Sequence, residues 1–339
     1  MRSALSIASV ALLIAVAPHA PAADREFYRG MTVSCQTWGT EWETPQMATT
    51  LAELHGLGVN SIAIHPYARI EQDGHLHFRQ RSGSTYITTP LHWAHQLGMS
   101  TMLIPHIAYW GTRFSWRGEI DFTSAQEWDR FFSDYEVWIE QMAQLAESEH
   151  SELFCVGLEL AHAERFDQRW RNIIAAVRKI YHGKITYGAN WDRYEAVKFW
   201  DAVDYIGVLA YFPLTDSPDP SRTQLDVAWR QRGAELARFS RRNGGKQVLF
   251  TEIGYNESSR AAAEPWTFQT GGDHAAEIQL RCIESALAAS ENSPWLAGMF
   301  WWKWFPELPH DEEENYRLQT PAIKSLIARY WQPQAASAR

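Results

Sequence analysis

The sequence predicts a single-domain α/β fold, an eight-stranded (β/α)8 or TIM barrel. Short apolar runs alternate with segments of helical period along the chain, as parallel strands joined by crossover helices require. Eight such runs occur over roughly 300 residues with no linker between them, which is typical of a closed barrel. No Gly-x-Gly-x-x-Gly motif follows the first run, which disfavours an open sheet that binds a dinucleotide.

The strands are predicted from runs that lack polar alternation. Parallel strands covered on both faces have this character. The eight runs are residues 27–34, 61–65, 101–106, 154–160, 184–189, 205–211, 247–253 and 297–302.

The helices are predicted from apolar residues three and four positions apart. The clearest stripe contains Trp128, Phe131, Phe132, Tyr135, Trp138, Ile139, Met142 and Leu145. It is one packing face and not a ligand site. Further helices are predicted around residues 46–57, 89–97, 170–177, 224–242, 274–290 and 321–330, with a short one after Tyr194.

The N-terminus has the layout of a secretory signal peptide. Arg2 precedes an apolar run over residues 4–17 and a small-residue triplet that ends at Ala22. The run is shorter than the ~20 residues that cross a bilayer, so a transmembrane anchor is disfavoured. We expect a signal peptide at residues 1–22, a catalytic domain at 23–333 and a frayed tail at 334–339. The expected location is secreted or periplasmic, with no membrane association after cleavage.

Composition narrows the class of function. The formal net charge is -9 without a basic stripe, so no nucleic-acid partner is expected. Three cysteines without a Cys-x-x-Cys pair disfavour thiol redox chemistry and structural zinc. The sequence contains 17 tryptophans, whose indole faces suit the C–H faces of sugar rings. We expect no cofactor and a monomer.

Two glutamates are the candidate catalytic groups. Glu159 and Glu252 each close an apolar run, the fourth and the seventh, where an unpaired charge would be costly to bury without a purpose. Either one alone could be a structural ion-pair member. Together, across a barrel mouth, they could face each other at the ~5 to 5.5 Å typical of retaining glycosidases.

Several motifs, in order along the chain, resemble glycoside hydrolase family 113. They are Pro-His at 105–106, Trp-Arg-Gly at 116–118, GLEL at 157–160, YGANW at 187–191, DYIG at 204–207, AYFPL at 210–214, TEIGY at 251–255 and FWWKW at 300–304. The resemblance implies a retaining barrel glycosidase, best known as a β-1,4-mannanase, with Glu159 as acid/base and Glu252 as nucleophile. One departure concerns substrate choice. Many members of the wider clan have Asn before the acid, whereas this chain has Leu158.

Binding residues are predicted from the same strand ends and the loops that follow. Tyr211 would hydrogen bond Glu252, Trp302 would stack beneath the reacting sugar, and Asn190 could replace the missing clan asparagine. The remaining candidates for sugar contacts are His106, Trp116, Arg117, Trp38 and Trp191. For each, packing in the core or under a loop remains the alternative.

No metal site is predicted. His75 and His77 lie on one face of a strand, but no third ligand has a suitable spacing, so we expect a polar hairpin in the second loop. The leading hypothesis is double displacement on a β-linked hexose polymer, with mannan or glucomannan as substrate. The alternatives are a related barrel acting on another β-glycan or an exopolysaccharide, and an inactive exported carbohydrate-binding protein. The sequence leaves open the sugar, the cleavage mode and the number of subsites.

Overall fold

A computed structural model describes residues 27–78, 85–291, 293–306 and 316–332. The predicted signal peptide and C-terminal tail lie outside the described residues. None of the described helices has the length and apolar character needed to cross a membrane.

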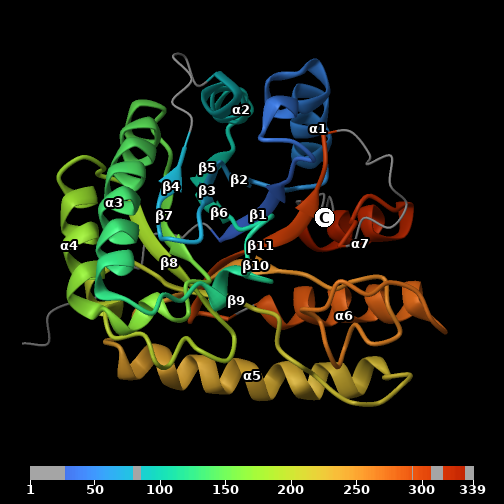
Figure 1. Ribbon diagram of the computed structural model, residues 1–339. Helices are drawn as coiled ribbons and strands as arrows, with labels where there is room; N and C mark the ends of the chain where they lie inside the picture. The colour runs from blue at the N-terminus through green and yellow to red at the C-terminus, as the bar shows by residue number, and fades with distance from the viewer. Residues whose placement is uncertain (1–26, 79–84, 292, 307–315, 333–339) are drawn as a thin grey trace, which may run out of the picture.

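The centre of the fold is a closed barrel of eight parallel strands, in the order β1-β11-β10-β9-β8-β7-β5-β2 (Figure 1). Its strands are β1 (Tyr28–Val33), β2 (Ser61–Ile64), β5 (Ser100–Leu103), β7 (Leu153–Leu158), β8 (Lys184–Asn190), β9 (Ile206–Leu209), β10 (Val248–Ile253) and β11 (Leu296–Trp304). Each overlaps one predicted run. The predicted barrel is therefore confirmed.

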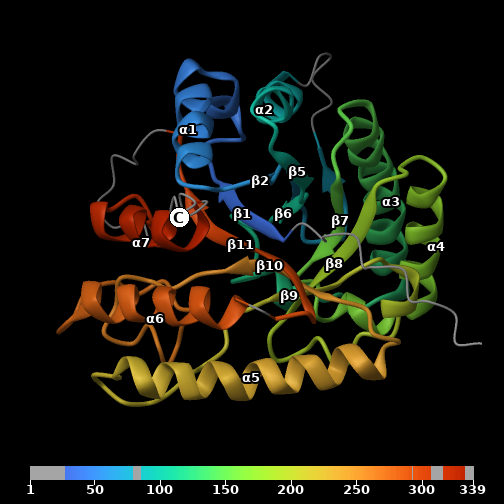
Figure 2. The ribbon, with the colours of Figure 1, turned by 180° about the vertical axis from the view of Figure 1, so that it is seen from behind.

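Helices surround the barrel on all sides in the two opposite views (Figures 1 and 2). They are α1 (Pro45–Gly56), α2 (Thr85–Gln96), α3 (Ala125–Ser148), α4 (Asp167–Arg178), α5 (Arg222–Arg242), α6 (Ala275–Ser290) and α7 (Pro321–Trp331). The prediction of a short α-helix after Tyr194 is wrong. That segment forms turns and one 3-10 helix (Trp200–Ala202), because the buried Trp200 indole donates to the Tyr194 carbonyl at 2.8 Å and closes the loop.

The third predicted run divides into two strands. β5 stays in the barrel, whereas β6 (His106–Ala108) pairs with β3 (Tyr67–Ile70), which pairs antiparallel with β4 (Leu76–His77). Pro105 separates β5 from β6, since proline has no N–H to donate and restricts the residue before it. The expected hairpin is thus present, and it stands above the barrel mouth on the second loop.

Inward and outward side chains alternate along the barrel strands. In β7, Leu153 and Cys155 pack inside the barrel, while Phe154 and Val156 pack against the helices. Inside the barrel, the ring of Phe300 lies so close to Gly30 that a Cβ there would stand 2.4 Å from it. The interior is therefore a packed core, and only the mouth is available to a ligand.

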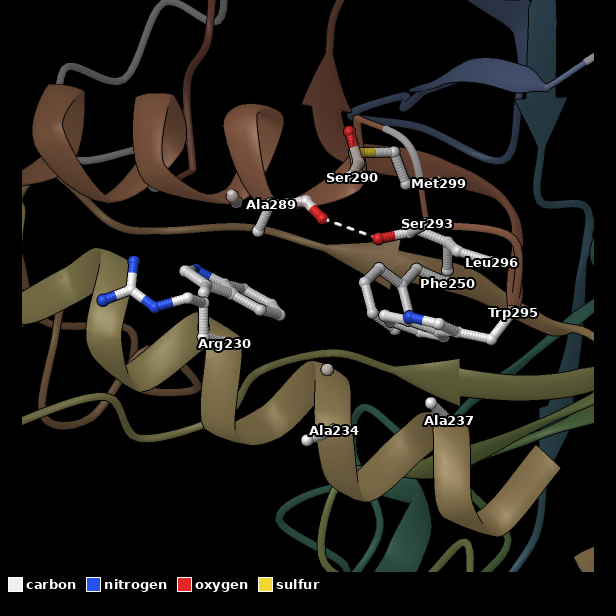
Figure 3. A pocket seen from close by; sticks show the side chains of 13 residues that line it. Arg230, Ala234, Ala237, Phe250, Ala289, Ser290, Ser293, Trp295, Leu296 and Met299 are labelled. Carbon is white, nitrogen blue, oxygen red and sulfur yellow. Dashed lines mark hydrogen bonds between the residues drawn. The ribbon is translucent and has the colours of Figure 1, made fainter. Parts of the chain in front are cut away.

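One small cavity, of about 270 Å³, lies in the outer layer between α5, α6 and the strands β10 and β11 (Figure 3). Trp229, Phe250 and Trp295 form its walls, and alanines from both helices complete them. Ser293 donates to the Ala289 carbonyl at 2.9 Å at its rim. No carboxylate or histidine lines this cavity, so we regard it as a packing gap.

Candidate active site

Glu159 lies immediately after β7, at a break in the strand. Its backbone is left-handed, with φ of 58°, which is uncommon for a residue with a side chain. Its own N–H still donates to the Gly188 carbonyl of β8 at 2.9 Å. The next N–H, of Leu160, donates to the Tyr187 hydroxyl at 3.2 Å. These two bonds fix the turn that carries the Glu159 carboxylate over the mouth.

Buried groups beneath this turn hold it in place. A Cβ on Gly157 would stand 2.8 Å from the rings of Trp170 and Tyr187, so this position requires glycine. The Tyr187 hydroxyl donates in turn to Glu164 Oε1 at 3.2 Å. Burial raises the pKa of Glu164 to about 7, although the nearby Arg193 and the Tyr187 bond oppose the shift.

Glu252 lies within β10 and is 4% exposed. The Tyr211 hydroxyl donates to its Oε2 at 3.0 Å. Tyr211 stands two residues beyond the end of β9, and the Ala210 N–H donates to the Glu252 carbonyl at 2.8 Å. The predicted contact between Tyr211 and Glu252 is therefore present in the geometry.

Arg117 and His106 connect the two carboxylates. Arg117 donates through Nη1 to Glu159 Oε2 at 2.7 Å and through Nη2 to His106 Nδ1 at 3.1 Å. Its Nε donates to the Ile107 carbonyl at 2.9 Å, which holds the guanidinium in place. The other imidazole nitrogen, His106 Nε2, lies 3.5 Å from Glu252 Oε1.

The tautomer of His106 follows from this arrangement. Arginine can only donate, so His106 Nδ1 must accept and the proton must reside on Nε2. Burial, followed by the charge of Arg117 and the neighbouring His65, keeps the pKa of His106 well below its usual value. A neutral His106 therefore presents an N–H toward Glu252.

The two carboxylates influence each other's protonation. Burial first and the charge of Glu159 second raise the pKa of Glu252, while Arg117, the Tyr211 hydrogen bond and Lys303 lower it, and the net pKa is about 8. Two interacting carboxyls release their protons in two separate steps. Glu252 therefore holds its proton more firmly than an ordinary glutamate, and contacts that lower its pKa favour the ionised form.

An aromatic platform lies beside Glu252. Trp302, near the end of β11, is half-buried, and its ring is 5.8 Å from the His106 ring with the planes 28° apart. His65 stacks on His106 at 4.8 Å and contacts Trp302 at 5.2 Å. The exposed part of Trp302 is thus fixed from behind by two imidazoles.

The structure brings together six of the predicted site residues: Glu159, Glu252, His106, Arg117, Tyr211 and Trp302. His106 was predicted to contact sugar and Arg117 likewise, but His106 is wholly buried and Arg117 is held by Glu159. In this structure both residues contact the carboxylates, and their sugar contacts stay predictions.

The other four predicted residues make other contacts. Asn190, at the end of β8, is 9% exposed. Trp191 follows it and stacks on Trp266 at 5.2 Å. Trp38 is exposed on the first loop, and half-buried Trp116 packs over Gly118.

Sequence reasoning missed four residues of the cluster's surroundings. His65 ends the second predicted run, so the strand-end rule that selected His106 could have selected it as a site residue. Lys303 follows Trp302 within the FWWKW motif and could have been selected with it. Tyr67 and Tyr316 have no comparable signal, since their positions depend on how the hairpin and the last loop fold over the mouth. Among the described residues, no three His, Cys, Asp or Glu side chains gather in a way that could hold a metal ion.

Comparison with protein-family models gives a match over residues 31–319 to Glycoside Hydrolase Family 113. The chain belongs to glycoside hydrolase family 113. This GH113 protein is therefore a glycosidase, and the resemblance inferred from its motifs is confirmed. A comparison with curated proteins found no significant match.

Solved structures agree with the family assignment. A GH113 β-mannanase from Alicyclobacillus acidocaldarius, in complex with ManMIm, is 28% identical with a TM-score of 0.78; the alignment covers 91% of this chain and 98% of that one. A GH113 β-1,4-mannanase is 23% identical with a TM-score of 0.79, covering 91% and 100% of the two chains. A family 5 mannosidase from Rhizomucor miehei, at 10% identity and a TM-score of 0.56, covers 90% and 92% and shares the fold.

Proposed function

We propose that this GH113 glycosidase hydrolyses β-1,4-mannan or glucomannan with retention of anomeric configuration. The observation that supports the mechanism most strongly is the continuous contact from Glu159 through Arg117 and His106 to Glu252. Its last link, from His106 Nε2 to Glu252 Oε1, is a close approach of 3.5 Å and not a hydrogen bond. The choice of mannan rests on the solved GH113 relatives, which are described as β-mannanases.

In the first step, ionised Glu252 attacks the anomeric carbon and forms a glycosyl ester, while the bond to the leaving oxygen breaks. Glu159 gives its proton to that oxygen. In the second step, Glu159 takes a proton from water, and the water oxygen displaces Glu252 from the anomeric carbon. The side chain of Glu159 is 18% exposed and that of Glu252 is 6% exposed. The greater exposure of Glu159 suits its role, because Glu159 must take the proton from water in the second step.

The neighbours of each carboxylate support these roles. Arg117 lies 2.7 Å from Glu159 and stabilises the carboxylate that forms when the proton leaves. Tyr211 and the Nε2–H of His106 approach opposite oxygens of Glu252 and favour its ionised, correctly oriented form. We assign Asn190, Trp302 and Trp191 to sugar binding. Trp116, in the loop that precedes Arg117, stays a predicted sugar contact.

The catalytic test combines two variants. We expect Glu252→Ala to lose nearly all turnover of mannan while it still binds manno-oligosaccharides, because the nucleophile is gone and the platform remains. We expect Glu159→Ala to lose far more activity on mannan than on an activated aryl β-mannoside, whose leaving group needs no proton. Substantial turnover by Glu252→Ala, or equal losses for Glu159→Ala on both substrates, would contradict the assignment.

The substrate test is a panel of mannan, glucomannan, xylan and galactan, with reducing ends counted and the anomer of the first product read by NMR. Release of reducing ends from mannan, with the β-anomer as the first product, supports the proposal. Release only from another β-glycan would favour the alternative substrate class. Activity on none of them would favour a binding protein.

We also propose that the protein is exported and acts as a monomer. The signal-peptide pattern of residues 1–22 supports export. Sequencing the mature N-terminus should find a start close to residue 23, and an intact Met1 in the exported fraction would contradict this.

A further inference from the structure

The two carboxylates divide the barrel mouth into unequal halves. Going round the barrel, β9 and β8 lie between β10 and β7 on one side, and β11, β1, β2 and β5 lie between them on the other. Trp302, the platform for the reacting sugar, belongs to β11 and so to the wider half. With the proposed mechanism, we expect the part of the glycan that stays bonded to the reacting carbon to extend over the loops that follow β1, β2 and β5.

A row of aromatic rings crosses this wider half. The His65 ring, in contact with Trp302, is 5.2 Å from Tyr67, and Tyr67 is 5.9 Å from Trp38 and 5.2 Å from Trp110. Trp38 and Trp110 contact each other at 6.2 Å, yet they are 50% and 52% exposed. The row thus leads from the reacting sugar to two indoles that present large apolar surfaces to solvent.

A cavity of about 820 Å³ adjoins the outer end of this row. Trp38 lines it from the first loop, and the β3–β4 hairpin lines it with Tyr67, Arg69, Glu71 and His77. This volume is in the range of sites that hold small organic ligands. The hairpin therefore encloses a hollow large enough for sugar units beyond the one at the cleavage point.

The lining of this cavity combines the two features that a sugar requires. An indole and a phenol supply apolar faces. Glu71 Oε1 lies 3.8 Å from both Arg69 Nε and His77 Nε2, too far for good hydrogen bonds, and all three side chains are at least 42% exposed. Their donors and acceptors remain available to hydroxyl groups. The opposite charges of Arg69 and Glu71 offset each other, which favours a neutral ligand over an anionic one.

We propose that this cavity is an outer subsite on the nonreducing side of the cleavage point, binding a neutral hexose unit of the substrate chain between Trp38 and the β3–β4 hairpin. The inference rests on the proposed function for the direction of the glycan. It adds the residues Tyr67, Arg69, Glu71 and His77 to the protein's carbohydrate contacts, none of which the sequence pattern selected.

The test measures binding by calorimetry in the full-length Glu252→Ala protein, so that no turnover interferes. The ligands are mannotriose and mannohexaose, with cello-, xylo- and galacto-hexaoses as further probes. We expect Trp38→Ala, added to this background, to raise the Kd of the hexaose roughly tenfold, which is the scale of one lost aromatic contact. The Kd of the triose should rise by about twofold or less. We expect Glu71→Gln to act in the same direction, and Val137→Ala, an equally exposed position on α3, to change neither affinity.

Equal losses for the short and the long ligand, or no loss for either, would overturn the subsite. Failure of every hexaose to bind the Glu252→Ala protein would overturn it as well. Circular dichroism and recovery of affinity by Trp38→Phe exclude a folding defect. If wild type cleaves no glycan while Trp38 still controls hexaose affinity, the proposed function fails, and the cavity is a hexose-binding site but not an outer subsite of a cleavage site.

Discussion

Removing the Tyr211 hydroxyl tests how far its hydrogen bond lowers the pKa of Glu252. Tyr211→Phe deletes one hydrogen bond of 3.0 Å to a carboxylate that is 4% exposed, and it leaves the ring packed as before. Hydrogen bonds to charged groups contribute about 1.5–3 kcal/mol. Each pKa unit corresponds to 1.36 kcal/mol, so the loss amounts to roughly one to two units. Because the bond stabilises the ionised form, its removal must raise the pKa of Glu252.

The assay is the pH dependence of kcat/KM on an activated aryl β-mannoside, which requires an ionised nucleophile and no acid. We expect the acidic limb of the Tyr211→Phe profile to move upward by about one to two pH units. Below the limb, kcat/KM should fall roughly 10- to 100-fold, since each unit removes a factor of ten from the ionised fraction. A variant whose limb stays in place while kcat/KM falls equally at every pH would refute the reasoning, because Tyr211 would then act on geometry or binding alone.

Four further outcomes are expected. The kcat/KM for an activated aryl β-mannoside should rise as pH rises through about 8, where Glu252 ionises, and a value that is flat across that pH would count against the raised pKa of Glu252. Glu159→Gln should shift the acidic limb for aryl substrates downward, since it removes a negative charge that raises the pKa of Glu252; an unmoved limb would contradict this. The folded-state pKa of Glu164, about 7, lies above its unfolded value, so its contribution to stability is full at low pH and is lost as pH rises from about 4.5 to 7. Urea unfolding at pH 5 and pH 8 should therefore show wild type losing about 2–3 kcal/mol relative to Glu164→Gln, and parallel changes in both proteins would refute it. Gly157→Ala should destabilise by about 1–3 kcal/mol, because its methyl group would overlap the Trp170 and Tyr187 rings, and an unchanged unfolding midpoint would show that the rings can move.

The barrel was predictable because its signals are local. Unbroken apolar runs and stripes at helical spacing mark strands and helices without knowledge of their partners. The errors fall where tertiary contacts decide. Pro105 diverts β6 into the small sheet, and the Trp200 indole closes a loop where a helix was expected.

The site was predictable only in part. Strand ends identify Glu159, Glu252, His106 and Tyr211, because parallel strands bring their C-terminal ends to one face. The strand-end rule places these side chains at the barrel mouth, but it does not say which residues they contact there. The contact of Arg117 with Glu159 spans 42 positions and depends on how one loop folds back, so a sugar contact was the simpler expectation. The Tyr67 contacts depend on the hairpin in the same way.

The cavity between α5 and α6 is a site for stabilising substitutions that lies away from the catalytic residues. Gly233 lies within α5 at the wall of this cavity, and a methyl group there would stand 3.3 Å from the Trp295 indole. Alanine favours a helix interior over glycine by about 1 kcal/mol, a gain that is kept where the Trp295 indole shifts by a few tenths of an ångström into the cavity. A more heat-resistant enzyme could thus be sought from the outer shell inward, with the catalytic mouth left unaltered.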